Sequence, residues 1–176
     1  MLFHETELQG AYLIEPQLIE DSRGFFARVF CRNEFADHLL NPTVAQSNIS
    51  WNVRKKTLRG IHLQVEPHAE VKLVRCTRGA IYDIILDLRH DSTTFGQWIG
   101  RELTAENHLM MYVPEGFGHA YQALEDDTEV LYQVSECYAP GFERGIRWND
   151  PAFNIQWPYM DPILSEKDKN HEDWKE

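Results

Sequence analysis

The sequence predicts an all-β protein with a single domain, and three observations support this fold class. The 176 residues are enough for one sizeable core, and 43% of them are hydrophobic and 12% aromatic, as in globular domains. Short runs rich in Val, Ile, Tyr and Phe are bounded by Gly, Pro, Asp and Asn, which is typical of strands joined by turns. Helical periodicity is sparse. Many short strands of this kind predict a β-sandwich or a β-barrel.

Three segments carry the clearest strand pattern. Residues 80–89 (AIYDIILDLR) and residues 129–138 (EVLYQVSECY) alternate between two faces, as a strand requires. Residues 108–124 (HLMMYVPEGFGHAYQAL) are interrupted at Pro114 and Gly116 and then resume the same pattern. We therefore expect two strands in that segment.

Two short helices are expected outside the strands. Residues 31–40 (CRNEFADHLL) predict one helix with Asn33 as its N-cap. The C-terminal segment, about residues 160–176, is expected to be partly helical and to pack on the barrel. In this segment Ser165 is a predicted N-cap, with Asp168 in the first turn.

Charge and cysteine content limit the class of protein. A net charge of −11 argues against nucleic-acid binding. No apolar run approaches the roughly 20 residues that span a bilayer, and the N-terminus lacks the pattern of a signal peptide. The three cysteines are an odd number without metal-type spacing, which predicts free, mostly buried thiols in the cytoplasm. They are Cys31, Cys76 and Cys137.

Residues 54–78 form a basic island in this acidic chain. They contain seven Lys and Arg residues but only two Glu residues. A local positive field suits a small anionic ligand better than a polymer. A solvated basic face of a sheet would explain the same pattern.

The island also contains His62 and Lys72, which predict a shared cavity. In a strand over LRGIHLQ, His62 and Gln64 lie on one face. Lys72 begins the next apolar run, and residues 67–70 are a plausible turn between the two strands. We therefore expect His62 and Lys72 to project from adjacent strands into one cavity.

A metal site on these strands is a weaker alternative. β-Barrel metal sites often use a His-x-His pair, a following Glu and a later His. Here those positions would be His62, Gln64, Glu70 and His119. Glutamine is a poor substitute for imidazole as a transition-metal ligand, and Lys72 would lie unfavourably close to a cation. The sequence therefore favours no metal, with a site of His62, Glu70 and His119 left as the alternative.

Several motifs in order carry a resemblance to a known family. They are EDSRGFFARVF, QSNIS, LRGIHLQ, KLVRC, VPEGFGHAYQAL, YQVSECYAPGFERGIRWNDP and LSEKD. Over residues 5–170 the chain resembles the dTDP-4-dehydrorhamnose 3,5-epimerase family of nucleotide-sugar epimerases. The resemblance implies a cupin-like jelly roll over residues 1–176, a homodimer, and catalysis without metal or organic cofactor.

The resemblance also implies a role for individual residues. His62 would be the general base that removes a proton beside the 4-keto group, and Asp168 would orient it. Lys72 would stabilise the enolate oxygen, and Tyr132 would protonate the opposite face of the sugar. The expected contacts to substrate are Arg23, Gln46, Asn48, Arg59, His119, Tyr138 and Glu143.

Elementary chemistry agrees with the four catalytic assignments. Removing a proton beside a ketone needs a base with a pKa near the working pH, and free histidine titrates at about 6.5. The enolate needs a cation or a donor at its oxygen, which Lys72 would supply. Inversion needs a second group on the other face, because returning the proton to the first face would only exchange it.

Three single positions and one short segment depart from the common family pattern. Arg28 replaces a glutamate, Leu63 an aromatic residue and Glu70 a glutamine, while GFGHAY replaces GFAHGF. Arg28 and Glu70 would pair with each other if the two changes compensate. These departures bear on the substrate more than on the reaction.

The leading hypothesis is an epimerase of a nucleotide-linked 4-keto-6-deoxyhexose that inverts C3, C5 or both. A keto-sugar isomerase on the same fold is the nearest alternative. A metal-dependent cupin enzyme and a non-catalytic jelly-roll binding module also remain open at this point.

Overall fold

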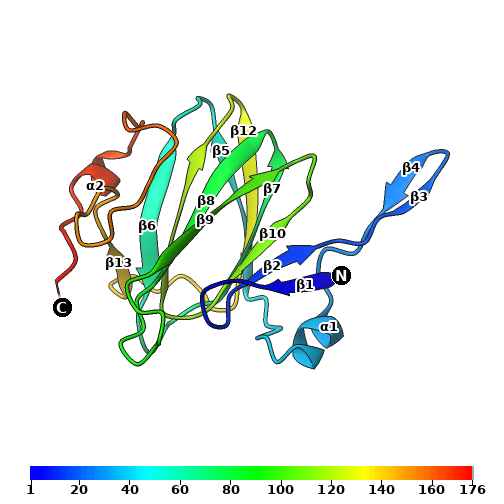
Figure 1. Ribbon diagram of the computed structural model, residues 1–176, viewed down its shortest axis with the longest axis horizontal. Helices are drawn as coiled ribbons and strands as arrows, with labels where there is room; N and C mark the ends of the chain where they lie inside the picture. The colour runs from blue at the N-terminus through cyan, green and yellow to red at the C-terminus, as the bar shows by residue number, and fades with distance from the viewer. Residues whose placement is uncertain (176) are drawn as a thin grey trace.

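The computed structural model describes residues 1–175, and its main feature is a pair of facing antiparallel sheets (Figure 1). The first sheet has six strands in the spatial order β1 (Leu2–Glu5), β2 (Tyr12–Glu15), β10 (Met110–Val113), β7 (Lys72–Arg78), β12 (Thr128–Val134) and β5 (Gln46–Asn52). The second has five strands in the order β13 (Glu143–Gly145), β6 (Leu58–Gln64), β11 (Phe117–Ala123), β8 (Ala80–Asp87) and β9 (Trp98–Thr104). The predicted all-β class is confirmed.

The remaining elements lie outside the two sheets. A hairpin of β3 (Ile19–Asp21) and β4 (Gly24–Phe26) projects away from them, as Figure 1 shows at the right. Helix α1 (Arg32–Asp37) and helix α2 (Glu166–Lys169) are both short. None of the helices in residues 1–175 is long and apolar enough to span a membrane.

The main core fills the space between the sheets. Val74 of β7 and Val130 of β12 pack against Ile85 of β8 and Tyr121 of β11, and all four are buried. Because strand side chains alternate, the neighbouring residues Ile84 and Leu86 point to the other face of the five-stranded sheet. They are also fully buried, in a second apolar cluster.

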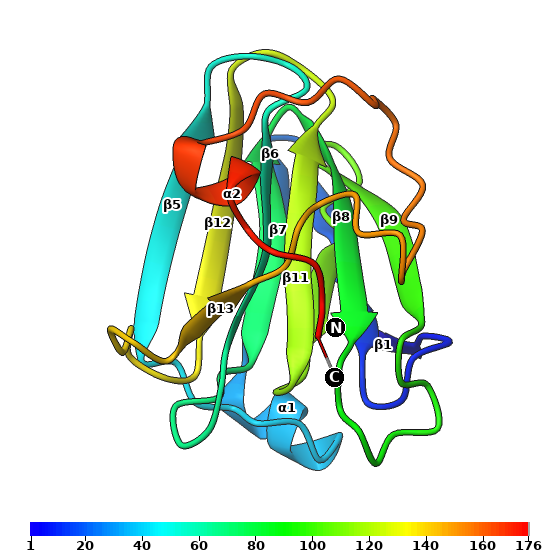
Figure 2. The same cartoon turned by 90° about the vertical axis from the view of Figure 1, so that its left-hand side faces the viewer.

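That second cluster is covered by the C-terminal part of the chain. Ile146, Phe153 and Trp157 pack against the outer face of the five-stranded sheet. Figure 2 shows this segment and α2 crossing in front of that sheet. Strand β8 is therefore buried on both faces, which explains why it is mostly apolar apart from Asp83 and Asp87.

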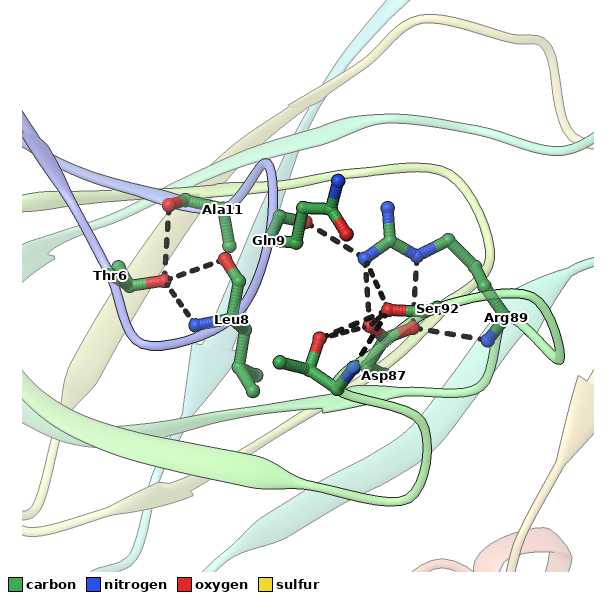
Figure 3. Close-up of polar contacts among 8 residues, drawn as sticks. Thr6, Leu8, Gln9, Ala11, Asp87, Arg89 and Ser92 are labelled. Atoms are coloured by element: carbon green, nitrogen blue, oxygen red, sulfur yellow. Dashed lines mark hydrogen bonds and ion pairs between the residues drawn. The ribbon is translucent and has the colours of Figure 1, made fainter.

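A polar clamp ties the end of β8 to the turn between β1 and β2 (Figure 3). Arg89 donates from Nε to Asp87 Oδ1 over 2.9 Å and from Nη2 to Asp87 Oδ2 over 2.7 Å. The same guanidinium donates to the Gln9 carbonyl over 2.8 Å, and Thr94 donates to Asp87 over 2.6 Å. Several donors thus satisfy the buried Asp87 carboxylate, which stabilises the loop after β8.

Local predictions had mixed outcomes. Helix α1 begins two residues earlier than the predicted Asn33 cap implies. Its N-cap is Cys31, which makes no side-chain cap bond within residues 1–175, so the Asn33 cap is wrong. The Ser165 cap is confirmed, because its Oγ accepts a bond from the Asp168 N–H over 3.0 Å. The expectation of mostly buried thiols is wrong, because only Cys76 is buried and Cys137 is exposed.

Candidate active site

A cavity of about 470 Å³ opens between the two sheets and is closed on one side by the segment that leads into α2. Side chains of both sheets and of α2 line it, and they include all four predicted catalytic residues. Its lining includes Ser50, Arg59, His62, Lys72, His119, Tyr121, Tyr132, Lys167 and Asp168. The structure therefore brings the four predicted catalytic residues together at one cavity.

His62 and Asp168 form a hydrogen-bonded pair at the cavity wall. His62 Nε2 lies 2.6 Å from Asp168 Oδ1; the imidazole is 43% exposed and the carboxylate 5%. Burial alone would raise the pKa of Asp168, but hydrogen bonds to His62 and Ser165 and the charge of His62 hold it below its ordinary value. Asp168 is therefore an anion that can orient the ring and stabilise a protonated His62.

Lys72 faces His62 from the opposite sheet, not from a neighbouring strand. Strand β6 carries His62 in the five-stranded sheet, while β7 carries Lys72 in the six-stranded sheet. The expected strand pair is therefore wrong, because the two strands lie in different sheets. The shared cavity is confirmed, since both side chains line it.

Lys72 has a built-in counter-ion in Glu70. The ammonium forms an ion pair with the Glu70 carboxylate, and both side chains are about nine-tenths buried. Gln64 Nε2 donates to the other carboxylate oxygen over 3.2 Å. Lys72 therefore presents a positive charge that Glu70 partly neutralises.

Tyr132 stands beside Lys72 on the wall opposite His62. It belongs to β12, which pairs with β7 so that Tyr132 is in register with Val74. Burial, followed by the negative charge of Glu70, raises the pKa of the Tyr132 phenol above its ordinary value. The hydroxyl is therefore protonated at neutral pH, as a proton donor must be.

A second histidine–aspartate pair lies next to His62 on the same wall. His119 is opposite His62 in the pairing of β11 with β6, and its Nε2 lies 2.7 Å from Asp83 Oδ1. Asp83 is fully buried, and its other carboxylate oxygen has no hydrogen-bond partner in the described part of the chain. Burial raises the pKa of Asp83, while His119 acts against that shift.

Arg59 supplies a second cationic group to the cavity. Its Nε donates to Asn52 Oδ1 over 2.9 Å, and its Nη2 donates to the Trp51 carbonyl over 3.1 Å. Both contacts are to neutral groups, so the guanidinium charge remains available to an anion.

Tyr121 and Ser50 are among the lining residues that were not predicted from the sequence. Tyr121 and Ser50 share a hydrogen bond of 2.7 Å between their hydroxyl oxygens, and both face the cavity. Tyr121 is two residues beyond His119 on β11. Strand alternation from a predicted site residue was therefore a signal that could have found it.

Four other predicted substrate contacts lie around the cavity without lining it. Gln46 Oε1 accepts a bond from the Tyr138 N–H over 2.7 Å, and Asn48 is in register with Tyr132. Glu143 pairs with Lys167, a lining residue, over 2.7 Å.

Arg23 lies elsewhere in this chain. It occupies the tip of the β3–β4 hairpin, pairs with Asp21 and has a side chain that is 87% exposed. In Figure 1 this hairpin and the segment around α2 lie at opposite sides of the molecule. The structure therefore does not bring Arg23 to the cavity of its own chain.

Two interaction hypotheses from the sequence are not supported. Arg28 pairs with Glu34 over 2.8 Å, whereas Glu70 pairs with Lys72, so a direct Arg28–Glu70 pair is wrong within this chain. The alternative metal ligands His62, Glu70 and His119 also have separate partners. They do not converge as a set among residues 1–175.

Comparison with known proteins agrees with this geometry. The model of the dTDP-4-dehydrorhamnose 3,5-epimerase family matches residues 5–176. A protein of that name from Methanothermobacter thermautotrophicus is 43% identical over 176 residues, covering 98% of this chain and 92% of its own. This chain belongs to the dTDP-4-dehydrorhamnose 3,5-epimerase family.

Solved structures of this epimerase family share the fold over nearly the whole chain. The dTDP-4-dehydrorhamnose 3,5-epimerase of Elizabethkingia anophelis has a TM-score of 0.96 and 38% identity, over 99% of this chain and 96% of its own. ChmJ, a 3'-monoepimerase from Streptomyces bikiniensis in complex with dTDP-quinovose, has a TM-score of 0.89 and 34% identity, over 97% of this chain and 86% of its own. The expected cupin-like jelly roll is confirmed.

One departure from the epimerase pattern lies away from the cavity. Leu63 follows His62 on β6, so its side chain points to the opposite face, where it is buried in the second apolar cluster. Glu70, in contrast, contacts the cavity residue Lys72 directly. Of these two changes, only the one at position 70 alters the charge of the site.

Proposed function

We propose that this protein is a cofactor-independent epimerase of a nucleotide-linked 4-keto-6-deoxyhexose. The observation that carries the proposal is the opposition of two sets of groups across one cavity. His62, oriented by Asp168, comes from one sheet, and Lys72 and Tyr132 come from the other. A base on one face, an acid on the other and a cation between them are what inversion beside a ketone requires.

In the proposed reaction, His62 takes a proton from the carbon beside the 4-keto group. The nitrogen that accepts it is Nδ1, because Nε2 is hydrogen-bonded to Asp168. The electrons of the broken C–H bond move to the carbonyl oxygen, which becomes an enolate stabilised by Lys72. The enolate then collapses and takes a proton from Tyr132 on the opposite face, which completes the inversion.

The substrate is proposed to be anionic, with a diphosphate near Arg59. Arginine binds phosphate oxygens through two donors at once, and the contacts of Arg59 to Asn52 and Trp51 orient its guanidinium. Relatives solved with dTDP-quinovose or dTDP-4-keto-L-rhamnose support a nucleoside-diphosphate sugar. Gln46, Asn48 and Tyr138 are proposed to contact the nucleotide end.

We also propose that the protein works as a homodimer in the cytoplasm. Strand β5 is at an edge of its sheet and exposes Ile49 and Trp51, and the projecting hairpin exposes Phe25 and Phe26. Exposed apolar side chains at an open sheet edge favour pairing with another chain. Such pairing would account for Arg23, which would then contact substrate in the second copy. A reducing compartment suits the free thiols.

Solvent exchange tests the proposed reaction directly. The protein is incubated with dTDP-4-keto-6-deoxyglucose in D2O, and NMR follows deuterium at C3 and C5 together with the configuration of each carbon. We expect deuterium with inversion at C3, C5 or both, and the pattern identifies which carbons react. Failure to incorporate deuterium from this substrate and from a panel of other nucleotide 4-keto sugars would contradict the proposal.

A further inference from the structure

A third ionisable side chain converges on the His62–Asp168 pair. His171, on the segment after α2, places its Nε2 3.4 Å from Asp168 Oδ1, the same oxygen that contacts His62. The two imidazole rings are 5.6 Å apart and nearly perpendicular. One ligand atom from each of the three residues lies within 4.8 Å of the others.

This trio has the composition of an open zinc site. Zinc ligands lie at about 2.0–2.2 Å, so the ligand atoms of a tetrahedral site are about 3.3 Å apart. The separation of His171 Nε2 from Asp168 Oδ1 already matches, at 3.4 Å. His62 Nε2 would have to move away from Asp168 by about 0.7 Å to reach the tetrahedral spacing. The His62 ring is partly exposed to the cavity and not fully enclosed by protein atoms.

His171 is held in place but lacks a hydrogen bond at its metal-facing nitrogen. Its ring packs on Gly145, where an added Cβ would lie 2.0 Å from His171 Cε1. The flanking backbone is anchored by the Arg147 N–H, which donates to the Glu172 carbonyl over 3.0 Å. His171 Nε2 is nevertheless buried, and it has no hydrogen-bond partner among residues 1–175. Buried polar atoms without a hydrogen bond are uncommon in native proteins, and a bound ion is one arrangement that would satisfy this nitrogen.

Neighbouring charges leave the trio able to accept a cation. Lys72 and Lys167 also face the cavity, but each is paired with a carboxylate, from Glu70 and Glu143 respectively. Arg59 remains as an unneutralised positive group and Asp168 as the negative one. The ligands themselves are a carboxylate and two imidazoles, the donor set that zinc prefers over hard cations such as Mg²⁺.

We propose that His62, Asp168 and His171 bind one zinc-type divalent ion, which inhibits the enzyme. The ion would use the His62 lone pair and the Asp168 carboxylate, and a water would fill its fourth position. His62 could then no longer be held by Asp168 in the orientation that accepts the substrate proton. The binding part of this proposal stands on geometry alone, while the inhibition part rests on the proposed function.

Zinc binding is measured first, without any assay of activity. The protein is freed of metal with a chelator, dialysed against Zn²⁺ and analysed for bound metal, and Co²⁺ replaces Zn²⁺ for visible absorption spectroscopy. We expect one ion per chain and a cobalt spectrum of low coordination number. His171→Gln should weaken binding at least tenfold, and His171→Asn serves as a second variant in case the first unfolds.

The matched control is His4→Gln, which removes an exposed histidine at the edge of the six-stranded sheet. It should bind zinc as the wild type does. Binding of less than one ion per chain, or equal affinity of the wild type and the folded His171 variants, would overturn the proposed site.

Inhibition is measured by deuterium exchange at increasing Zn²⁺, with chelator added at the end. We expect exchange to stop at one bound ion per chain, to return with chelator, and to need at least tenfold more zinc in His171→Gln. Exchange that continues with the site filled would refute inhibition. If metal-free protein shows no exchange, the proposed function fails instead, and the binding result still decides the site.

Discussion

Asp87 and Asp168 are both buried carboxylates, but their surroundings differ. Asp87 is surrounded by donors from Arg89, Ser92 and Thr94, and these lower its pKa to about 2 although burial acts in the opposite direction. Asp168 instead shares one oxygen with two imidazoles, one of which opens into the cavity. Asp87, whose oxygens are occupied by hydrogen-bond donors, stabilises a loop. Asp168, which contacts a titratable imidazole at the cavity, is available for chemistry.

The largest expected effect is on turnover, which should depend strongly on Asp168 and little on Asp87. Asp168→Asn should lower kcat by about 10²- to 10⁴-fold, because the neutral amide cannot stabilise a protonated His62. The melting temperature should change little, since the amide has nearly the same volume and the Ser165 cap uses the backbone N–H. Turnover assays and thermal unfolding together check this prediction.

Asp161→Asn is the matched control for that substitution. Asp161 also lies in the C-terminal segment, where it pairs with Lys56 and is 74% exposed. It should keep wild-type turnover. If Asp168→Asn retained activity within a few-fold of wild type, the orienting role assigned to Asp168 would be wrong.

The next largest effect is expected from Tyr132→Phe, which should lose inversion but keep proton removal. Tyr132→Phe should lose inversion by about 10²-fold or more, because the donor on the second face is gone. Deuterium exchange at the carbon beside the ketone should persist, since His62 and Asp168 remain. NMR in D2O reads both quantities in one sample. Tyr12→Phe on β2 is the control, and normal inversion by Tyr132→Phe would remove Tyr132 from its role as the acid.

Asp87 should show the reverse pattern, with an effect on stability and not on the reaction. Asp87→Asn should lower the free energy of unfolding by about 2–3 kcal/mol, because it weakens charge-assisted bonds to buried donors. The rate of epimerisation well below the melting temperature should stay within a few-fold of wild type. Chemical denaturation and turnover assays measure the two quantities.

The effect of Asp87→Asn on the free energy of unfolding should depend on pH. The folded-state pKa of Asp87 is lowered to about 2, whereas an unfolded aspartate titrates at about 3.9. Its contribution to stability is therefore complete above about pH 4 and is lost as the pH falls towards 2. Wild type and Asp87→Asn should accordingly differ at pH 6 and converge as the pH is lowered from 4 to 2. A difference that stays constant over that interval would show that the carboxylate charge is not responsible.

Local sequence patterns predicted several strands and one of the two helix caps, because those features depend on neighbouring residues. Alternation located β8 and β12, and the Ser165 cap placed Asp168 at the start of α2. Local patterns could not assign His62 and Lys72 to facing sheets, because the choice of pairing partner is made by residues distant in the chain. His171 was missed although it follows Asp168 by only three residues, because the segment after α2 has no regular pattern that would indicate where its side chain points. Its ring packs on Gly145, a residue distant in the chain.

Glu70 lies between the two cases, because it is a buried carboxylate with a cationic partner that also belongs to the site. Glu70→Gln should have the smallest effect, a change of a few-fold in kcat, since the amide keeps a hydrogen-bond acceptor near Lys72. We expect kcat to rise, because Lys72 loses its counter-ion and becomes a stronger partner for the enolate oxygen.

Tyr132 reports this change of charge independently of turnover. The negative charge of Glu70 contributes to raising the Tyr132 pKa, so Glu70→Gln should lower that pKa. Ultraviolet difference titration, with Tyr132→Phe subtracted in both backgrounds, isolates the phenol. An unchanged or higher Tyr132 pKa would mean that Glu70 does not set the electrostatics of the acid. The ion pair with Lys72 would then resemble the Asp87 clamp, a structural contact that happens to border the cavity.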